Sequence, residues 1–425
     1  MKNILLLGSG GRECTLAWKL SQSPLCGTFF IAPGNAGTNE YGTNLPIAYN
    51  DFEGIKKACI EYKIDILFPG PEDPLVAGIY DFFKNDALLK HIIVVGPSKE
   101  GAQLEGSKAF SKKFMERHNI PTAAYKEFTA ESFEQGVAYI KRSEPPIVIK
   151  ADGLAAGKGV VIAQDTIEAV KAFRAMVMNR QFGDAGKKVV IEQFLDGIEL
   201  SVFAFTDGTN YILLPEAKDY KRIGEGDTGP NTGGMGAISP VPFANDEFML
   251  KVTERIILPT IKGLKAEGIV YNGFIFFGLI KVKDEPYVIE YNCRLGDPES
   301  EVVIPRLEND LVELILSMNE RKLGDVEVQF SSKAAATVML VSEGYPGDYP
   351  KGRKMAGFEK VKGSFLFHAG TKFQDKAIVT NGGRVLAITS YGEDIKQALE
   401  KSYENAELIV YEGKNYRKDI GWEFR

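Results

Sequence analysis

Four continuous apolar runs in the first hundred residues limit the fold most strongly. They read "NILLLG", "GTFFIAPG", "DILFPGPE" and "IIVVGPS", and each one contains or ends in Gly or Pro. Amphipathic segments such as "CTLAWKLSQS" and "DFEGIKKACIEYK" lie between them. Strands that are apolar on both faces and alternate with helices are typical of a doubly wound parallel sheet. We therefore predict an N-terminal α/β domain over residues 1–103, with its ligands at the carboxyl ends of the strands.

The loops that follow these strands exclude a nicotinamide dinucleotide. "GSGGRE" supplies Gly8 and Gly10, but Glu13 stands where a dinucleotide-binding loop needs its third glycine. The second strand ends in "APGNAG", without the acidic residue that holds a ribose hydroxyl. We expect these loops to present backbone N–H groups and a helix N-terminus to a smaller anion.

A glycine-rich loop joins two β-branched runs in "IVIKADGLAAGKGVVIA", residues 147–163. It does not fit the Walker phosphate loop, because only three residues separate Gly153 from Gly157, and Gly159 follows Lys158 where Ser or Thr is needed. Its flanking strands predict a hairpin, whose backbone N–H groups and Lys158 would close over phosphates like a lid. A plain surface turn with a solvated lysine is the alternative.

Other residues near this hairpin favour a nucleotide. Lys150 ends its first strand, and Lys108 lies in "EGSKAFSKKF". In "KVVIEQFLDGIELS" an acidic residue and the backbone after it are placed to read the adenine edge, and a second acid to hold the ribose. These residues are Glu192, Phe194, Leu195 and Glu199.

A metal site is indicated by "EPYVIEYNCRLGDPESE", where Glu290 and Asn292 stand two residues apart on one strand. Such residues face the same side of a sheet. Two oxygen ligands suit Mg²⁺, which keeps waters and phosphate oxygens for its remaining positions. A solvated strand face is the alternative for this pattern.

Bulk properties exclude several classes of protein. The net charge is −6, which argues against nucleic acid as the main partner. No apolar run of about eighteen residues occurs, so we expect no membrane span, and the N-terminal run is too short for a signal peptide. The cysteines, Cys14, Cys26, Cys59 and Cys293, lack metal-ligand spacing. We expect a soluble, cytoplasmic protein of several domains.

Four segments together resemble one known family. "KADGLAAGKGV", "IEQFLDGIE", "DTGPNTGGMG" and "EYNCRLGDPE" are similar to the phosphoribosylamine–glycine ligases (glycinamide ribonucleotide synthetases) of the ATP-grasp superfamily. The resemblance runs from "LLGSGGRE" to "YRKDIGW". It implies an α/β fold with the N-terminal parallel-sheet domain, a central ATP-grasp domain of two α+β subdomains over 104–324 (lid subdomain about 125–193), and a small β-rich domain over 325–425.

The resemblance also implies a reaction. ATP, glycine and 5-phosphoribosylamine would give glycinamide ribonucleotide, ADP and phosphate through a glycyl phosphate, with Mg²⁺ or Mn²⁺ and in a monomer. The chain has only three histidines and no visible Ser-His-Asp or Cys-His constellation. Phosphoryl transfer of this kind needs positioning and charge neutralisation more than acid–base groups.

Site residues follow by similarity. Lys108, Lys150 and the lid residues Gly157, Lys158 and Gly159 would contact the phosphates. The adenosine would lie on the residues named above, and Glu290 and Asn292 would hold the metal. Arg294 and Asp219 would be catalytic. The guanidinium of Arg294 presents pairs of N–H donors, which suits it to a phosphate. The residues that would bind the other substrates are Gly10, Asn35, Gly37, Thr38, Glu72, Asp219, Asp227, Asn231, Thr232, Gly234, Met235, Arg294, Asp297, Pro298 and Glu299.

Some positions depart from the family pattern. Cys14, Lys218 and Tyr220 replace residues that are commonly His, Gln and His, which argues against a histidine role at these places. Two other functions stay open: an ATP-grasp ligase that activates bicarbonate or formate, and a non-catalytic module that senses ATP. The pairing of "DTGPNTGGMG" with "GDPE" favours glycine, and the presence of both metal ligands favours catalysis.

Overall fold

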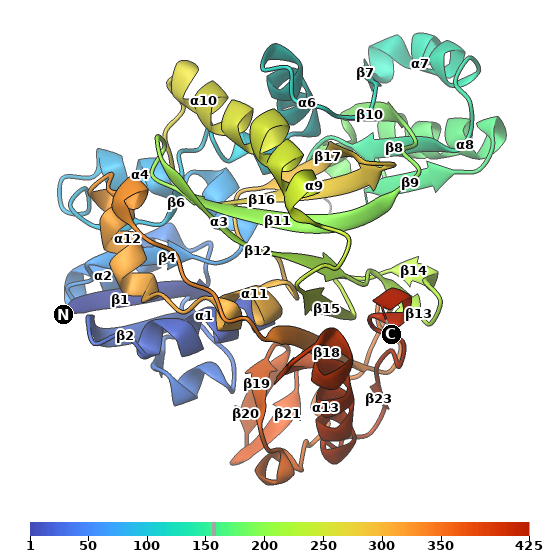
Figure 1. Ribbon diagram of the computed structural model, residues 1–425. Helices are drawn as coiled ribbons and strands as arrows, with labels where there is room; N and C mark the ends of the chain where they lie inside the picture. Colours follow the sequence, from blue (N-terminus) through green and yellow to red (C-terminus); the bar gives the residue numbers. More distant parts are fainter. Residues whose placement is uncertain (155–158, 425) are drawn as a thin grey trace.

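The first hundred residues form the parallel sheet that the sequence predicts. The computed structural model describes residues 1–154 and 159–424, and its first sheet has the order β3-β2-β1-β4-β5, all parallel (Figure 1). The strands are β1 (Lys2–Gly8), β2 (Cys26–Pro33), β3 (Thr43–Asn44), β4 (Ile66–Pro69) and β5 (Ile93–Val94). The helices among them are α1 (Gly11–Ser21), α2 (Phe52–Glu61), α3 (Glu72–Ala77) and α4 (Ile79–Asn85).

Strand β1 is apolar from Ile4 to Leu7 because this part of it is covered on both faces. Leu6 belongs to the same buried cluster as Leu16 of α1, whereas Leu5 belongs to the cluster of Ile55 of α2. Successive side chains of a strand point to opposite faces, so a strand between two helical layers needs apolar residues at every position. This arrangement places the loop after β1, with Gly10, at the carboxyl edge of the sheet.

A separate four-stranded antiparallel sheet carries the predicted hairpin, at the upper right of Figure 1. Its order is β7-β10-β8-β9, with β8 and β9 antiparallel and Lys150 opposite Val160. The hairpin prediction is therefore confirmed for its strands, while Gly157 and Lys158 lie outside the described residues. The elements are β7 (Tyr125–Thr129), α7 (Phe133–Ile140), β8 (Ile147–Ala151), β9 (Val160–Ala163), α8 (Thr166–Val177) and β10 (Lys188–Gln193).

The largest sheet connects the middle of the chain to its C-terminal part. Its path is β17-β16-β11-β12-β15-β18-β22-β19, joined at the centre where Gly236 of β15 pairs with Val338 of β18. The strands are β11 (Ile198–Thr206), β12 (Tyr211–Asp219), β15 (Gly236–Ser239), β16 (Tyr271–Val282), β17 (Glu285–Asn292), β18 (Ala334–Ser342), β19 (Ser364–His368) and β22 (Arg384–Gly392). Short strands β6 (Gly96–Pro97) and β23 (Lys414–Asn415) pair with β16 and β18.

Helices and small hairpins complete the structure. Helix α13 packs on β18 and β22 in the C-terminal part (Figure 1). The helices are α5 (Gln103–Gly106), α6 (Lys108–Arg117), α9 (Asp246–Val252), α10 (Leu258–Ala266), α11 (Ser300–Arg306), α12 (Leu311–Asn319) and α13 (Ile395–Leu408). The small hairpins are β13 (Arg222–Gly224) with β14 (Thr228–Asn231), and β20 (Thr371–Gln374) with β21 (Ala377–Thr380).

A search for membrane-crossing helices over residues 1–154 and 159–424 finds none with the required length and apolar character.

We predict that Phe277→Ala in β16 destabilises the fold without touching the cavity described below. Phe277 is fully buried on the core face of the sheet and its ring lies 5.5 Å from that of Tyr291. Removing a buried phenyl group leaves a cavity and costs about 3–5 kcal/mol. Urea denaturation followed by circular dichroism should show this loss.

Val270→Ala, at a position that is 43% exposed, is the control and should change the free energy of unfolding by less than about 0.5 kcal/mol. Equal losses in the two variants would contradict the expectation.

Candidate active site

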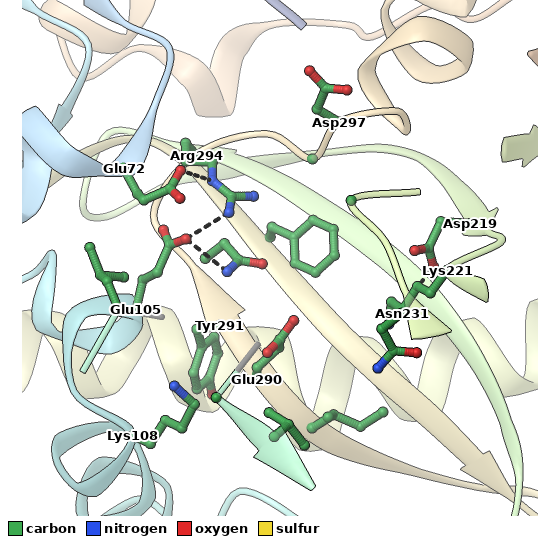
Figure 2. Close-up of a pocket in the computed structure, with 18 of the residues that line it drawn as sticks. Glu72, Glu105, Lys108, Asp219, Lys221, Asn231, Glu290, Tyr291, Arg294 and Asp297 are labelled. Atoms are coloured by element: carbon green, nitrogen blue, oxygen red, sulfur yellow. Dashed lines mark hydrogen bonds and ion pairs between the residues drawn. The ribbon is translucent and has the colours of Figure 1, made fainter. Parts of the chain in front are cut away.

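One cavity of about 660 Å³ lies where the parallel sheet, the hairpin sheet and the large sheet meet. Gly10 and Glu72 line it from the N-terminal domain, Lys150 from the hairpin sheet, Glu290 from β17, and Arg384 from the C-terminal part. Figure 2 shows Glu72, Lys108 and Glu290, from three separate elements, around the same space. The large sheet forms the floor of the cavity, and its register decides which side chains face it.

That register puts several acidic side chains on one face. Ser201 of β11 lies opposite Gly278 of β16, which lies opposite Glu290 of β17. Directly opposed residues of antiparallel strands project to the same side. Because Ser201 also pairs with Ala217 of β12, Asp219 is expected on this face two residues further along. Gly278 has no side chain, and a Cβ there would lie 3.0 Å from Glu290 Cγ, so the glycine leaves room for the side chain of Glu290.

A lysine compensates part of this negative charge. Lys221 Nζ lies 2.5 Å from a carboxylate oxygen of Glu199 and 3.9 Å from one of Asp219. Burial alone would lower the pKa of Lys221, but Asp219 and Glu199 raise it well above its ordinary value. Burial, with Glu199 beside it, raises the pKa of Asp219. Lys221 is therefore a fixed cation, and Glu199, which the sequence analysis places on the ribose, is already paired with it.

Three charged residues meet at the hairpin end of the cavity. Glu192 Oε2 lies 3.0 Å from Lys150 Nζ and 3.2 Å from Lys112 Nζ. Burial would raise the pKa of Glu192, but the two lysines hold it below its ordinary value. Its other oxygen, Oε1, is buried and has no hydrogen-bond partner among the described residues. This oxygen is an acceptor that a bound N–H group would satisfy.

Glu290 and Asn292 offer oxygens that a hard cation could use. Asn292 Nδ2 donates to Glu105 Oε1 at 2.9 Å, which leaves its carbonyl oxygen available. Within the described part of the chain, no hydrogen bond or ion pair engages the carboxylate of Glu290, and no group of three or more His, Cys, Asp or Glu residues could hold a metal. The oxygen pair fits Mg²⁺, provided that phosphate oxygens and waters supply the remaining ligands.

Arg294 is held between two carboxylates (Figure 2). Its Nε donates to Glu72 at 3.2 Å and its Nη2 to Glu105 at 2.7 Å. Burial would lower the pKa of Arg294, but Glu105 and Glu72 raise it above its ordinary value. Glu105 also accepts from the backbone N–H of Cys293 at 2.8 Å. The guanidinium thus ties the N-terminal domain to the end of β17, and a substrate phosphate would reach only its remaining N–H bonds.

The N-terminus of α1 is occupied by protein carboxylates. Glu13 accepts from the backbone N–H of Gly10 at 2.7 Å, and Asp297 Oδ2 accepts from that of Arg12 at 3.1 Å. Arg384 Nη2 lies 2.9 Å from Asp297 Oδ1, and its Nη1 donates to the Asp297 carbonyl at 2.7 Å. The helix start that we expected to bind a small anion therefore serves to fix the loop of Asp297 instead.

Most of the predicted site residues line this cavity. They are Gly10, Glu72, Lys108, Lys150, Gly159, Glu192, Phe194, Leu195, Glu199, Asp219, Asn231, Thr232, Glu290, Asn292, Arg294, Asp297 and Glu299. Two further predicted residues, Gly157 and Lys158, lie outside the residues that the structure describes.

The loop of residues 33–38 does not reach the cavity, contrary to expectation. Asn35 Oδ1 accepts from the backbone N–H groups of Gly37 and Thr38, and its Nδ2 donates to the carbonyl of His368 at 2.6 Å. Thr38 is fully buried. This loop therefore docks the N-terminal domain on the C-terminal part rather than binding substrate.

Four more predicted residues do not line the cavity: Asp227, Gly234, Met235 and Pro298. Asp227 is held by Arg417, whose Nη1 lies 2.7 Å from its carboxylate. Met235 is fully buried in the core, and Gly234 lies against the ring of Pro298. In the loop of residues 227–235, Asn231 and Thr232 line the cavity, whereas Asp227, Gly234 and Met235 do not.

The sequence analysis missed several residues that line the cavity. Lys112 could have been found, because it stands four residues after Lys108 in α6 and so shares its helix face. Glu105, Lys221 and Arg384 carry no local signal, since long-range contacts bring them to the site. Other polar residues that line the cavity and were not predicted are Ser9, Arg12, Glu13, Tyr49, Asp73, Ser111 and Gln193.

Comparison with family models matches three consecutive parts of the chain. The N domain of phosphoribosylglycinamide synthetase matches residues 2–105, its ATP-grasp (A) domain residues 106–300, and its C domain residues 335–423. Together these matches cover most of the chain in the order of that family.

Individual relatives agree with the family models. The phosphoribosylamine–glycine ligases of Vibrio vulnificus (strain CMCP6) and Escherichia coli (strain K12) are each 46% identical over 425 residues, which span 99% of this chain and 98% of the relative.

Solved structures agree in fold. The crystal structure of the phosphoribosylamine–glycine ligase of Thermotoga maritima has a TM-score of 0.85 and 36% identity, covering 98% of this chain and 99% of that one. A biotin carboxylase domain from Hydrogenobacter thermophilus, solved with MgADP and bicarbonate, has a TM-score of 0.73 at 17% identity, covering 97% and 91%. The latter supports the ATP-grasp fold alone. The chain therefore belongs to the phosphoribosylglycinamide synthetase family, a family of ATP-grasp ligases.

Proposed function

We propose that the chain joins glycine to 5-phosphoribosylamine in two steps within the cavity described above. The overall reaction, which uses ATP and serves purine biosynthesis, is that of its family. In the first step a glycine carboxylate oxygen would attack the γ-phosphorus, and ADP would leave. In the second step the amine nitrogen would attack the carbonyl carbon of glycyl phosphate, phosphate would leave and the nitrogen would lose a proton. The observation that carries this proposal is the meeting of lysines, the Glu290/Asn292 pair and an acidic cluster in one space.

ATP would lie along the hairpin sheet. Lys108 and Lys150 would contact its phosphates, with Gly159 and the predicted lid residues above them. The unpartnered oxygen of Glu192 would accept from the amino group of adenine, next to the backbone of Phe194 and Leu195. Glu199 would reach the ribose only as half of its pair with Lys221. Positioning and charge neutralisation of this kind account for most of the catalysis of phosphoryl transfer.

Glu290 and Asn292 would hold Mg²⁺ or Mn²⁺ through their free oxygens. Such a cation, when bound, offsets the charge that develops on the phosphates. Glu105 fixes the amide of Asn292 so that its carbonyl oxygen points away from the hydrogen bond. Lys108, which is partly buried, adds a positive charge near Glu290, and desolvation lowers the pKa of Lys108.

Glycine and 5-phosphoribosylamine would occupy the part of the cavity between Asp219 and the N-terminal loops. Asp219, whose carboxylate lies 3.9 Å from its nearest cation, would hold the ammonium group of glycine. Arg294 would direct its free N–H bonds to the phosphate of the ribosylamine, with Gly10 and Glu72 beside it. Asn231, Thr232 and Asp297 would complete this wall.

An ATP-grasp ligase that activates bicarbonate is the competing function, because biotin carboxylase domains share the fold. A coupled assay of ADP release with glycine, formate and bicarbonate separates the two. We expect turnover with glycine and 5-phosphoribosylamine only. ADP release driven by bicarbonate or formate, and not by glycine, would reject the proposal.

We further propose domain boundaries near residues 103 and 324, a monomeric state and a cytoplasmic location. All four cysteines are unpaired thiols, as a reducing compartment would keep them. Sedimentation of the purified protein tests the monomer directly.

We predict that Glu290→Ala lowers kcat by about 10²-fold or more while leaving the fold intact, because a charge that compensates the phosphates and their cation is lost. ADP release over a Mg²⁺ titration measures the effect, and thermal unfolding checks the fold. Glu400→Ala, an exposed change on α13, serves as the matched control and should leave kcat unaltered. Unchanged turnover of the Glu290 variant at limiting Mg²⁺ would refute the role.

We also predict that Glu192→Gln weakens the preference for ATP over GTP. The amide must keep its oxygen toward Lys112 and Lys150, so its NH₂ group would face the adenine amino group. Two donors that face each other without an acceptor cost about 1–3 kcal/mol of binding free energy, and each 1.4 kcal/mol lowers the affinity about tenfold. The KM for ATP should rise about tenfold or more, and that for GTP should fall. Glu134→Gln changes an exposed residue on helix α7, which lies between β7 and β8, and should alter neither KM. An unaltered ratio in the Glu192 variant would contradict the adenine contact.

A further inference from the structure

One buried carboxylate of the cavity, which the family resemblance places on the other substrates, lacks a cation and has no chemical role assigned so far. Apart from the exposed Asp73, the carboxylates that line the cavity in the described part of the chain each lie within 4.0 Å of a cationic nitrogen, except Glu290 and Glu299. Glu290 is the proposed cation ligand. Glu299 is only 5% exposed, and its Oε1 accepts a hydrogen bond from Ser201 Oγ at 3.1 Å.

The register of the large sheet relates Glu299 to the phosphate end of the site. Its hydrogen-bond donor Ser201 lies in one row with Gly278 and Glu290, on the same face. Two strand spacings put Ser201 and Glu290 about 10 Å apart. A small cavity between them is lined by Ser201, Asp219, Gly278 and Glu290, because Gly278 has no side chain to fill it. Glu290 and Glu299 both line the main cavity of about 660 Å³, which has room for glycine between a phosphate at Glu290 and an amine near Glu299.

Amide formation needs a proton acceptor at this place. When a neutral amine attacks glycyl phosphate, the new C–N bond leaves a positive nitrogen, which must lose a proton as the C–O bond to phosphate breaks. The histidines of the chain do not line the cavity in the part that the structure describes. Lys221 and the arginines are cations and cannot accept a proton.

We propose that Glu299 is the general base of amide formation: its carboxylate accepts the proton that the amine nitrogen of 5-phosphoribosylamine loses while phosphate leaves glycyl phosphate. This inference rests on the two-step function proposed above and adds to it the group that completes the second step. Ser201 is a positioning residue, since its hydroxyl fixes one oxygen of Glu299 and leaves the other for the substrate.

The surroundings of Glu299 suit a base at neutral pH. Burial, and then the charge of Asp219, raise the pKa of Glu299 to about 7, while Lys221 and the Ser201 hydroxyl oppose the rise. Arg294 and Arg384 are the other charged groups that interact with it. A carboxylate with a pKa near the working pH is both sufficiently ionised and a good proton acceptor. Since only the ionised form accepts a proton, the rate of the second step should rise as pH increases through about 7.

A single-turnover experiment with all three substrates tests the proposal. ADP reports the first step and glycinamide ribonucleotide the second, both measured after rapid quenching. In the unaltered protein the two products should appear together. In Glu299→Gln, ADP should form at nearly the unaltered rate. The rate of ribonucleotide formation should fall by about 10²-fold or more, which is the usual loss when a general base is removed. If both products slow equally, or neither does, the proposal is wrong.

Two further measurements keep the result unambiguous. Glu299→Asp retains a carboxylate and should recover part of the ribonucleotide rate, and this variant decides the matter if the Gln variant does not fold. In the unaltered protein the second step should lose rate below about pH 7, and a flat profile from about pH 6 to about pH 8 would overturn the base role. Glu313→Gln, exposed on α12, is the matched control with unaltered rates.

A label separates failure of this inference from failure of the proposed function. With ¹⁸O in the glycine carboxylate, the unaltered protein should release phosphate that carries ¹⁸O, because glycine oxygen attacks the γ-phosphorus. Phosphate without ¹⁸O would reject the glycyl phosphate itself. Labelled phosphate together with equal slowing of both steps in the Glu299 variant would reject only the base.

Discussion

The antiparallel pairing of β16 with β11 and β17 is the constraint on which the site depends. It sets Ser201, Gly278 and Glu290 in one row and so decides which side chains face the cavity. A shift of either pairing by one residue would turn Glu290 into the core and bring an apolar residue to the cavity. Phe277 and Tyr291, which alternate with the site residues along their strands, help to hold the register because they are buried against each other.

Charge pairing explains how one cavity holds so many acids. Arg294 is shared by Glu72 and Glu105, Lys221 by Glu199 and Asp219, and Glu192 by two lysines. A buried charge without a partner is costly, so the pairs of Arg294 and of Glu192 fix side chains from different segments at the same time, whereas Lys221 and Glu199 are half exposed. Apart from the exposed Asp73, Glu290 and Glu299 fall outside this scheme among the described residues that line the cavity, and we propose that the reaction supplies a partner for each of them. Arg384 extends the scheme to the C-terminal part by binding the loop of Asp297.

The sequence was sufficient where a local pattern carried the information. The apolar runs predicted the parallel sheet, and the β-branched runs around Lys150 predicted a hairpin instead of a strand and helix. The spacing of Glu290 and Asn292 placed both on one face. Contacts that depend on distant segments could not be predicted, such as Arg384 on Asp297 or Glu105 on Asn292. The loop with Asn35 was mistaken for a substrate loop because nothing nearby in sequence shows that His368 covers it.

In the function proposed here, Glu290 and Asn292 face the same triphosphate as Lys108 and Lys150. Diffraction from crystals with Mn²⁺ and a non-hydrolysable ATP analogue tests it most directly, since the anomalous signal locates the metal without assumptions. We expect one Mn²⁺ bonded to Glu290 and to the carbonyl oxygen of Asn292, with phosphate oxygens of the analogue completing its ligands. Mn²⁺ bound elsewhere, or phosphates in a space that Lys108 and Lys150 do not line, would contradict it.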